Sequence, residues 1–388
     1  MTTCAKQSTF NNISRFDKCA NCGACYNACP AGAIALKDGL FYTLKIDETK
    51  CINCGRCVSV CPVNTPKKAQ KITAAYGAQH KDKTVIKDSS SGGAFSALAD
   101  YILAQGGIVY GACFSEDFDK VIFKSTADTA LNNLRRSKYA ESLVGDSFKQ
   151  IKEILSRGTK VLFCGTPCQV AGLKRVIGEN ENLYTVDFSC GGLPSHKLYS
   201  EHLAALKEKY KSEIAELNFR SKHFGWGTHC ISATFKNGKK YTKLAAHDPY
   251  FAGFLSSKLT VREYCYECAF SDNHYADLIL ADYWRYYDVY KNANRAGISL
   301  ILVNSPKGEA LMSAISGSMD IKPLPLEKAT YNIKPTKNSK ERYQKRAAFL
   351  QKAEKDGLKS AAKGYYLPTP FNKMLNLTRF YLKKITRR

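Results

Sequence analysis

Hydrophobic and polar residues alternate along the middle of the chain with periods that predict both strands and helices. Residues 72–79 and 107–114 are rich in β-branched and aromatic side chains, which favour strands. Two other stretches carry apolar side chains at helical spacing. The first stripe consists of Phe95, Leu98, Ile102 and Leu103, and the second of Phe148, Ile151, Ile154 and Leu155.

A strand–helix–strand pattern follows between residues 160 and 188. Residues 160–165, 167–177 and 183–188 predict a strand, a helix and another strand. The length of this unit suits a crossover connection between two parallel strands. We therefore predict a mixed α/β domain in the centre of the chain.

The region after residue 325 is dominated by basic residues. From Ile321 to Arg388 there are 18 Lys and Arg against 4 Asp and Glu, so this segment holds more than half of the net charge of +24. Residues 337–363 predict a charged helix or a solvated linker. The last predicted helix is basic and amphipathic, with an apolar face of Phe371, Met374, Leu375, Tyr381, Leu382 and Ile385. Such a helix suits contact with an anionic membrane surface, or packing on its own domain or an acidic partner.

Charge and composition also exclude several classes of protein. The basic residues are concentrated in the tail, which argues against a nucleic-acid-binding protein. The first residues lack the apolar core of a signal peptide, and no apolar run is long enough to span a bilayer. Half of the 16 cysteines lie in two tight runs, which suit metal better than disulfides. We expect a protein of the reducing cytoplasm, with peripheral contact to the inner face of the membrane as an alternative.

The two cysteine runs read CANCGACYNACP, from Cys19, and CINCGRCVSVCP, from Cys51. Each has the spacing C-x2-C-x2-C-x3-C-P of two-cluster bacterial ferredoxins, in which the fourth cysteine of each run binds the other cluster. Zinc sites usually place cysteine pairs farther apart, so two zinc ions are the weaker interpretation. The spacing predicts two 4Fe-4S clusters. The first would be bound by Cys19, Cys22, Cys25 and Cys61, and the second by Cys51, Cys54, Cys57 and Cys29.

Two polar stretches of the central domain could bind a phosphate. Residues 88–93 place three serines and two glycines before a predicted helix, where free N–H groups and the helix dipole favour an anion. Simple capping of the helix by Ser89, Ser90 or Ser91 explains the same pattern. Residues 135–139, RRSKY, bring three cations together, which suits a pyrophosphate, an acidic substrate or merely a solvated basic surface.

Further cysteines raise the question of a third metal site. Cys168 lies at a predicted strand–helix junction, Cys190 follows a predicted strand, and Cys265 and Cys268 form a C-x2-C pair. Together they are four thiolates from three segments. Cys164, four residues before Cys168, could be a buried thiol, a substitute ligand or half of a redox pair. A zinc site of Cys164, Cys168, Cys265 and Cys268 is a rival possibility.

Six ordered stretches resemble the beta subunits of coenzyme F420-dependent hydrogenases and dehydrogenases. They are SSGGAFSAL, RRSKYAES, VLFCGTPCQVAGLK, TVDFSCGGLPS, DPYFAGFLSSKLTVREYCYECAF and ADLILADYW, and together they span roughly residues 70–310. Members of this family resemble one another in binding FAD beside a 4Fe-4S cluster. The chain departs from the usual family pattern at Glu263, Tyr264, Tyr283 and Arg285.

The resemblance implies specific site residues. Cys168, Cys190, Cys265 and Cys268 would hold a third 4Fe-4S cluster. The flavin would contact Ser90, Ser91, Gly92, Gly93, Arg136, Ser137, Lys138, Gly165, Thr166, Pro167 and Gln169. No catalytic residue is predicted.

The fold class expected is therefore α+β or α/β in three parts. Residues 1–70 would form a two-cluster ferredoxin domain, 71–325 a domain for FAD and iron–sulfur binding, and 326–388 a basic helical tail. The predicted function is an iron–sulfur flavoprotein oxidoreductase. It would exchange electrons with a low-potential carrier such as a ferredoxin, and a hydride with a deazaflavin or another organic molecule.

Two alternatives remain open at this point. The chain could be a non-catalytic electron-transfer subunit that docks on a partner subunit of a larger complex. It could also be a flavin-dependent enzyme of surface-polysaccharide synthesis that acts on a sugar nucleotide.

Overall fold

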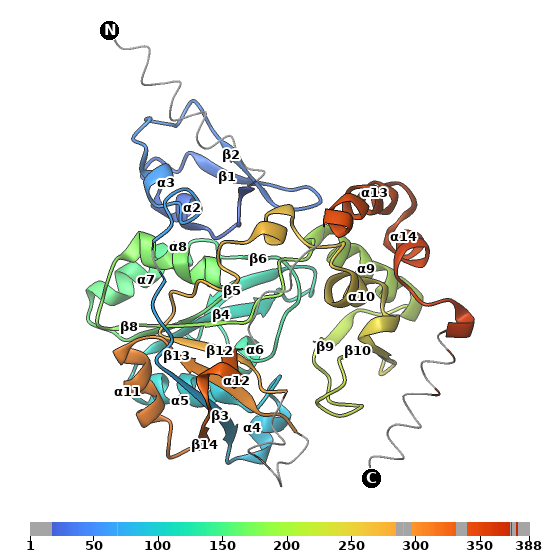
Figure 1. Ribbon diagram of the computed structural model, residues 1–388. Coiled ribbons are helices and arrows are strands. Elements are labelled where there is room, and N and C mark those ends of the chain that lie inside the picture. The colour runs from blue at the N-terminus through green and yellow to red at the C-terminus, as the bar shows by residue number, and fades with distance from the viewer. Residues whose placement is uncertain are drawn as a thin grey trace.

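The computed structural model describes residues 18–67, 69–284, 290, 296–330, 340–372, 374 and 378. The cysteine-rich N-terminal segment forms a small unit at one end of the molecule, shown in dark blue in Figure 1. It contains the helices α2 (Ala24–Ala28) and α3 (Arg56–Ser59) and the antiparallel hairpin of β1 (Ile34–Lys37) and β2 (Thr43–Ile46). Gly23 and Gly55 precede the two helices with φ of 82° and 68°, a left-handed conformation that glycine adopts without strain.

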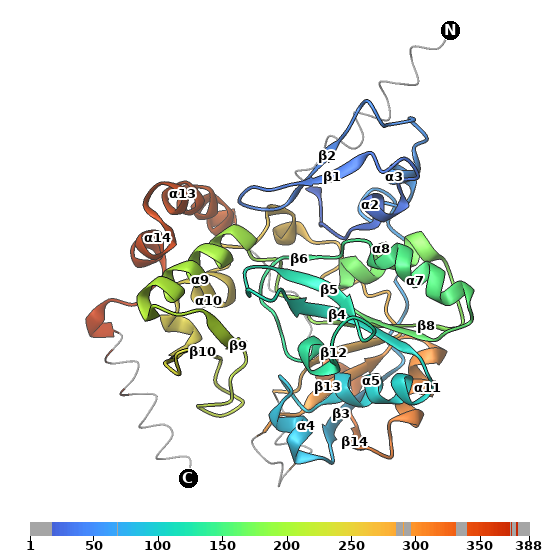
Figure 2. The same cartoon turned by 180° about the vertical axis from the view of Figure 1, so that it is seen from behind.

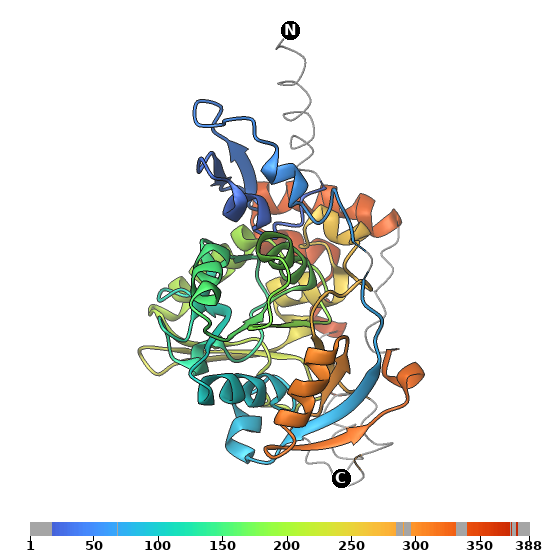
Figure 3. The ribbon, with the colours of Figure 1, turned by 90° about the vertical axis from the view of Figure 1, so that its left-hand side faces the viewer.

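The centre of the molecule is a nine-stranded sheet in the order β14-β3-β13-β12-β8-β7-β4-β5-β6. Its neighbours β12, β8, β7 and β4 run parallel, while β13, β3 and β14 pair antiparallel at one side. Figure 3 shows β3, early in the chain, lying beside the late strands in orange. The bounds are β3 (Ala74–His80), β4 (Ile108–Phe114), β5 (Val121–Ser125), β6 (Ser142–Leu143), β7 (Val161–Cys164), β8 (Leu183–Phe188), β12 (Leu278–Asp282), β13 (Ser299–Val303) and β14 (Met319–Pro323).

Helices cover both faces of this sheet. On one face, Phe148 and Ile151 of α7 and Leu173 of α8 pack against Phe163 of β7. On the other face, α5 and α11 pack against side chains that alternate with those, such as Leu162. This alternation reflects the two-residue period of a strand. The helices are α4 (Lys83–Lys87), α5 (Ala94–Ala104), α6 (Leu131–Leu134), α7 (Ser147–Ser156), α8 (Pro167–Ile177), α11 (Pro306–Ala314) and α12 (Leu326–Thr330).

The predicted elements of the centre are confirmed. The two apolar stripes are the buried faces of α5 and α7, and the predicted strand–helix–strand unit is β7, α8 and β8, with the two strands parallel. The predicted mixed α/β class with a ferredoxin-like N-terminal unit is also confirmed.

A second body of structure lies beside the sheet and is seen from behind in Figure 2. A three-stranded antiparallel sheet in the order β11-β10-β9 packs against helices from two distant parts of the chain. Its elements are α9 (His196–Tyr210), β9 (Ile214–Asn218), β10 (Cys230–Phe235), β11 (Lys240–Leu244), η2 (Ala245–His247), α10 (Pro249–Ala252), η3 (Gly253–Ser257), η4 (Glu263–Glu267), α13 (Lys340–Asp356) and α14 (Leu358–Tyr365).

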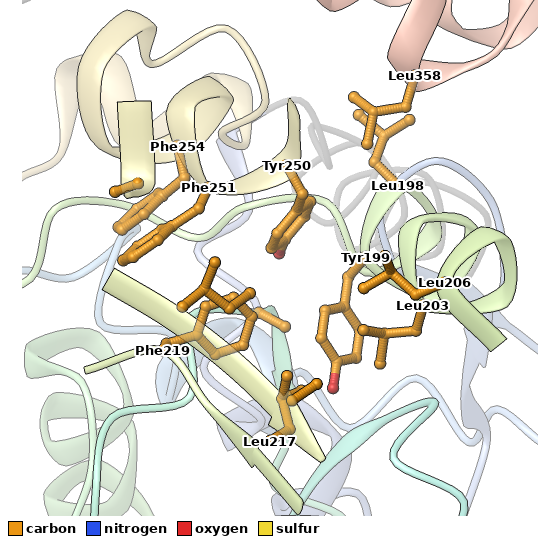
Figure 4. Packing of buried hydrophobic residues seen from close by; sticks show 14 of the residues in the cluster. Leu198, Tyr199, Leu203, Leu206, Leu217, Phe219, Tyr250, Phe251, Phe254 and Leu358 are labelled. Carbon is orange, nitrogen blue, oxygen red and sulfur yellow. The ribbon is translucent and has the colours of Figure 1, made fainter. Parts of the chain in front are cut away.

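The tail after residue 339 begins as a structural part of this second body. Phe349 is fully buried, and Leu358 lies beside Leu198 in the aromatic core drawn in Figure 4. The predicted charged helix therefore exists as α13 and α14, with one face buried and not wholly solvated. In the terminal amphipathic helix, Leu375, Tyr381, Leu382 and Ile385 lie outside the described residues. Within the described residues, no helix is both long and apolar enough to cross a membrane.

The packing of α13 predicts that Phe349→Ala strongly destabilises the protein. Removing a fully buried ring should cost about 3–5 kcal/mol of unfolding free energy, because the cavity cannot collapse fully. Thermal and denaturant unfolding of the full chain measure this loss. Lys355→Ala, an exposed change near the end of the same helix, is the matched control. If both variants unfold alike, the tail is not part of the core.

Candidate functional site

The N-terminal unit contains two cavities lined by predicted cluster ligands, and Cys57 borders both. One cavity is bordered by Cys19, Cys22, Cys25 and Cys61, and the other by Cys29, Cys51, Cys54 and Cys57. The last cysteine of each run therefore lies with the first three of the other run. Both cavities are consistent with the ligand exchange that two-cluster ferredoxins use.

The two cavities differ in their exposure to solvent. Cys22 is buried, whereas Cys54 is exposed beside Ile52, whose side chain is 65% exposed. Burial raises the pKa of the Cys19, Cys22 and Cys25 thiols, that of Cys25 to about 12. Thiols in such surroundings lose their protons readily only when metal takes the proton's place. The cavity at Cys22 faces the rest of the protein, and the one at Cys54 faces outward.

Helix α2 of this unit packs directly on α8 of the central domain. A side chain at Gly172 of α8 would place its Cβ 3.1 Å from the Cys22 sulfur, a tight contact that would require a shift of a few tenths of an ångström. Cys22 and Cys168 belong to one apolar cluster, and the Cys168 sulfur lies 3.7 Å from the carbonyl oxygen of Ala20. The first predicted cluster site and the third cysteine group are therefore adjacent.

The third group of cysteines is drawn together from three segments. Burial raises the pKa of the Cys168 thiol, and Cys268 and Cys190 raise it further. Burial likewise raises the pKa of Cys265, with Cys190 and Cys268 adding to the effect. Cys190 and Cys268 therefore lie within electrostatic range of both Cys168 and Cys265.

Cys164 has different neighbours. Burial, followed by the nearby Asp187 carboxylate, raises its pKa to about 12, while Lys138 opposes the rise. The charged groups that act on Cys164 thus include an acid and an amine but no cysteine. Among the described residues, no three His, Cys, Asp or Glu side chains are arranged to hold a single metal ion, and this applies to the proposed cluster ligands as well as to the rival zinc set.

The serine–glycine loop before α5 is held tightly against the sheet. The Ser91 hydroxyl donates to the Ile298 carbonyl at 2.8 Å, and the Gly92 N–H donates to the Ser299 hydroxyl at 3.0 Å. A Cβ at Gly92 would come within 2.3 Å of the Ala78 carbonyl oxygen. The interpretation of these serines as simple helix caps is wrong, because Gly93 caps α5 and no side chain bonds to the helix end.

The RRSKY stretch reaches this loop. The Ser137 N–H donates to the Ser90 hydroxyl at 2.9 Å. Arg136 forms ion pairs with Asp88 at 2.9 Å and Glu216 at 2.8 Å, so protein carboxylates already compensate its charge. Lys138 is half-buried, desolvation of its amine lowers its pKa to about 7, and the amine donates to the Asn133 carbonyl at 2.8 Å.

The remaining predicted flavin contacts lie at the start of α8. The Thr166 N–H donates to Oε1 of Gln169 at 2.9 Å, and the two residues form a capping box. The Gln169 amide also donates to the Ser142 hydroxyl at 3.0 Å. Gly165 and Pro167 complete the turn, so these four residues hold Cys168 in place. The predicted flavin residues therefore form two groups, one around Ser90 and one beside the cysteines.

A cluster of cationic and aromatic side chains beside the serine loop was not predicted from the sequence. Arg220 is buried and pairs with Asp282 at 2.8 Å, and its guanidinium lies 5.5 Å from the centre of the Trp284 ring. Trp284 stacks on Trp226 at 4.7 Å, and the Lys222 amine donates to the Ser91 carbonyl at 3.2 Å.

One buried nitrogen of this cluster lacks a hydrogen-bond partner within the described part of the chain. Nη2 of Arg220 has no hydrogen-bond partner among the described residues. The sequence signal for the cluster was the density of cations and aromatics in residues 219–229, which matches no known motif.

Two cysteine-lined cavities in a small unit, adjacent to a further group of four thiols, define an iron–sulfur protein. Comparison with family models supports this class: 4Fe-4S dicluster domains match residues 18–65 and 43–91. Models of the coenzyme F420 hydrogenase/dehydrogenase beta subunit match residues 75–148 for its N-terminal part and 158–328 for its C terminus. The chain belongs to this family of oxidoreductase subunits, as the sequence predicted.

Comparison with curated proteins found no match. Among solved structures, the chain is similar to one from the F420-reducing [NiFe] hydrogenase complex of Methanosarcina barkeri, at 17% identity and a TM-score of 0.44. That match covers 78% of this chain and 98% of the other.

The Arg220 cluster predicts a pH effect on stability. Burial and the charge of Arg220 lower the pKa of His229 from 6.5 to about 4. The unfolded chain therefore binds this proton below pH 6.5, whereas the folded chain does not, so stability falls as the pH drops from 6.5 toward 4. Between pH 7.5 and 5.5 the wild type should lose roughly 1 kcal/mol more than His229→Gln.

Unfolding midpoints at the two pH values measure this difference. His223→Gln removes an exposed histidine of the same segment and should behave as the wild type. An identical pH response of His229→Gln and wild type would contradict the assignment of His229 as a neutral, buried base.

Proposed function

We propose that this chain is an iron–sulfur flavoprotein oxidoreductase that carries electrons between a low-potential carrier and an organic hydride acceptor or donor. The observation that carries this proposal is the adjacency of three cysteine groups from the exposed Cys54 to the buried Cys168. When bound, clusters would supply one-electron steps, and a flavin would connect these to two-electron hydride chemistry.

The cysteines have the following proposed roles. Cys19, Cys22, Cys25 and Cys61 hold the inner N-terminal cluster, and Cys29, Cys51, Cys54 and Cys57 hold the outer one. Cys168, Cys190, Cys265 and Cys268 hold a third cluster. The buried sulfurs suit this role, because a cluster replaces protons that the thiols otherwise retain. The outer site, with Cys54 exposed beside Ile52, is where a carrier such as a ferredoxin would dock.

The proposed flavin site lies between the start of α8 and the serine loop. The Ser90–Ser137 pair would orient the phosphate end, and Arg136 would reach it only by exchanging its ion pairs with Asp88 and Glu216. Residues 165–169 would hold Cys168 at a fixed distance from the flavin. Arg220, with a free nitrogen and the stacked Trp284 nearby, would bind an anionic or planar part of the flavin or of the organic partner.

Cofactor content tests this proposal. Protein purified without oxygen should contain about twelve irons and about one flavin per chain, because three clusters of four irons are expected. Iron, sulfide and flavin are measured on the same sample. About eight irons without flavin would contradict the proposal. Full cofactor content without turnover of deazaflavin, nicotinamide or sugar nucleotide would favour the electron-transfer subunit instead.

Separate serine substitutions test which cysteine of residues 163–169 is a ligand. Cys168→Ser should lose about four irons, since one cluster loses a corner ligand. Cys164→Ser should keep its full iron content, because the charged neighbours of Cys164 include no cysteine. Anaerobic iron analysis and the visible absorption of the clusters provide the measurement. Equal losses from both variants would overturn the ligand assignment.

A further inference from the structure

A buried ion pair joins the N-terminal unit to the loop that carries Cys265. Arg262 and Glu141 are 5% and 1% exposed, and Nε of Arg262 donates to Oε1 of Glu141 at 2.9 Å. The carboxylate also accepts from Nδ2 of Asn21 at 2.9 Å and from the N–H of Tyr42 at 3.1 Å. Three segments that are far apart in the sequence therefore meet at one carboxylate.

Arg262 contacts proposed ligands of two different clusters. Its Nη1 is 3.5 Å from the carbonyl oxygen of Cys19. On the other side, the Arg262 carbonyl accepts from the N–H of Cys265 at 3.0 Å, and the Cys265 sulfur accepts from the N–H of Leu193 at 3.3 Å. Arg262 thus links the inner N-terminal site to the third thiol group through its side chain and its backbone.

Aromatic and charged neighbours hold this guanidinium in place. Its carbon lies 5.5 Å from the centre of the Phe41 ring, and Arg346 of α13 lies 5.3 Å from the same ring. The ring of Tyr42 stacks on that of His196 at 3.4 Å, and Nδ1 of His196 lies 3.2 Å from Glu141. The side chain therefore has little freedom to move away from either thiol group.

The orientation of the ion pair decides its electrostatic effect. Burial opposes ionisation of Glu141, but Arg262, His196 and the N–H of Tyr42 together keep the pKa of that carboxyl below its usual value. Nη1 of Arg262 lies 3.5 Å from the carbonyl oxygen of Cys19, whereas the Glu141 carboxylate is turned to Asn21, Tyr42 and His196. The positive end of the pair therefore faces the cysteines.

We propose that Arg262 is a positioning and tuning residue that raises the reduction potentials of the inner N-terminal cluster and the third cluster, with Glu141 limiting the rise. A reduced cluster carries one more negative charge, so a fixed cation in a low-dielectric site stabilises it. Each of the two clusters is therefore easier to reduce than it would be without this cation.

Redox titrations followed by electron paramagnetic resonance, on the full chain purified without oxygen, test this. Arg262→Gln should lower the potentials of the two clusters, with about a tenfold drop in each reduction equilibrium constant, or about 59 mV. Glu141→Gln should shift them in the opposite direction. Arg262→Lys should keep them near the wild-type values, because it retains the charge.

The controls separate charge from structure. Arg157→Gln makes the same change of charge at an exposed site and should shift nothing. Detachment of the N-terminal unit would move the Arg262→Gln and Glu141→Gln potentials in the same direction. Opposite shifts therefore support the proposal. No shift in Arg262→Gln, or an equal shift in Arg262→Lys, would overturn it.

This inference rests on the proposed third cluster, but the two can fail separately. If wild-type protein holds only about eight irons, the proposed function fails, whereas the cluster at Cys19 still reports on Arg262. If the protein holds about twelve irons and no variant shifts a potential, the proposed function stands and the role of Arg262 falls.

Discussion

The contact between α2 and α8 is the constraint on which the rest of this molecule depends. Electron transfer between the proposed clusters would require them to lie at short, fixed distances. Gly172 of α8 leaves room for Cys22 of the N-terminal unit to approach that helix. A side chain at Gly172 would crowd Cys22 and Ala24 of α2 and its N-terminal turn. The capping box at the start of α8 then fixes where that cysteine points. Helix α8 therefore positions both the N-terminal unit and Cys168.

The contact between the N-terminal unit and the rest of the protein is stabilised by polar as well as apolar interactions. The apolar part, with Cys22 and Cys168, excludes water from the path between the two sites. The polar part, centred on Glu141, binds residues of the N-terminal unit and of the Cys265 loop at the same time. A buried ion pair contributes little net stability once its desolvation is counted, but removing one partner is costly. The pair therefore favours one docked arrangement over others.

Much of this organisation could be predicted from the sequence, and the limits are physical. Cysteine spacing is local, so residues 19–30 and 51–62 indicated two clusters directly. The apolar stripe around Leu98 is also local, and it correctly predicted helix α5. The partners of Glu141 and Arg220 could not be predicted, because each pairs with residues more than fifty positions away. The role of the serines near Ser91 was also ambiguous, since hydroxyls cap helices and bind sheet carbonyls equally well. The burial of Phe349 could not be predicted, because the residues around it in the sequence are mostly charged.

The difference in exposure between the two N-terminal cavities has a consequence for damage. Oxygen and oxidants reach an iron–sulfur site by diffusion through solvent, and Cys54 stands exposed while Cys22 and Cys168 are buried. In the proposed arrangement the outermost site is therefore the first to be destroyed. A chain damaged in this way would keep its inner sites intact but would be disconnected from its carrier. Loss of the outer site would stop the entry of electrons before the buried sites are oxidised.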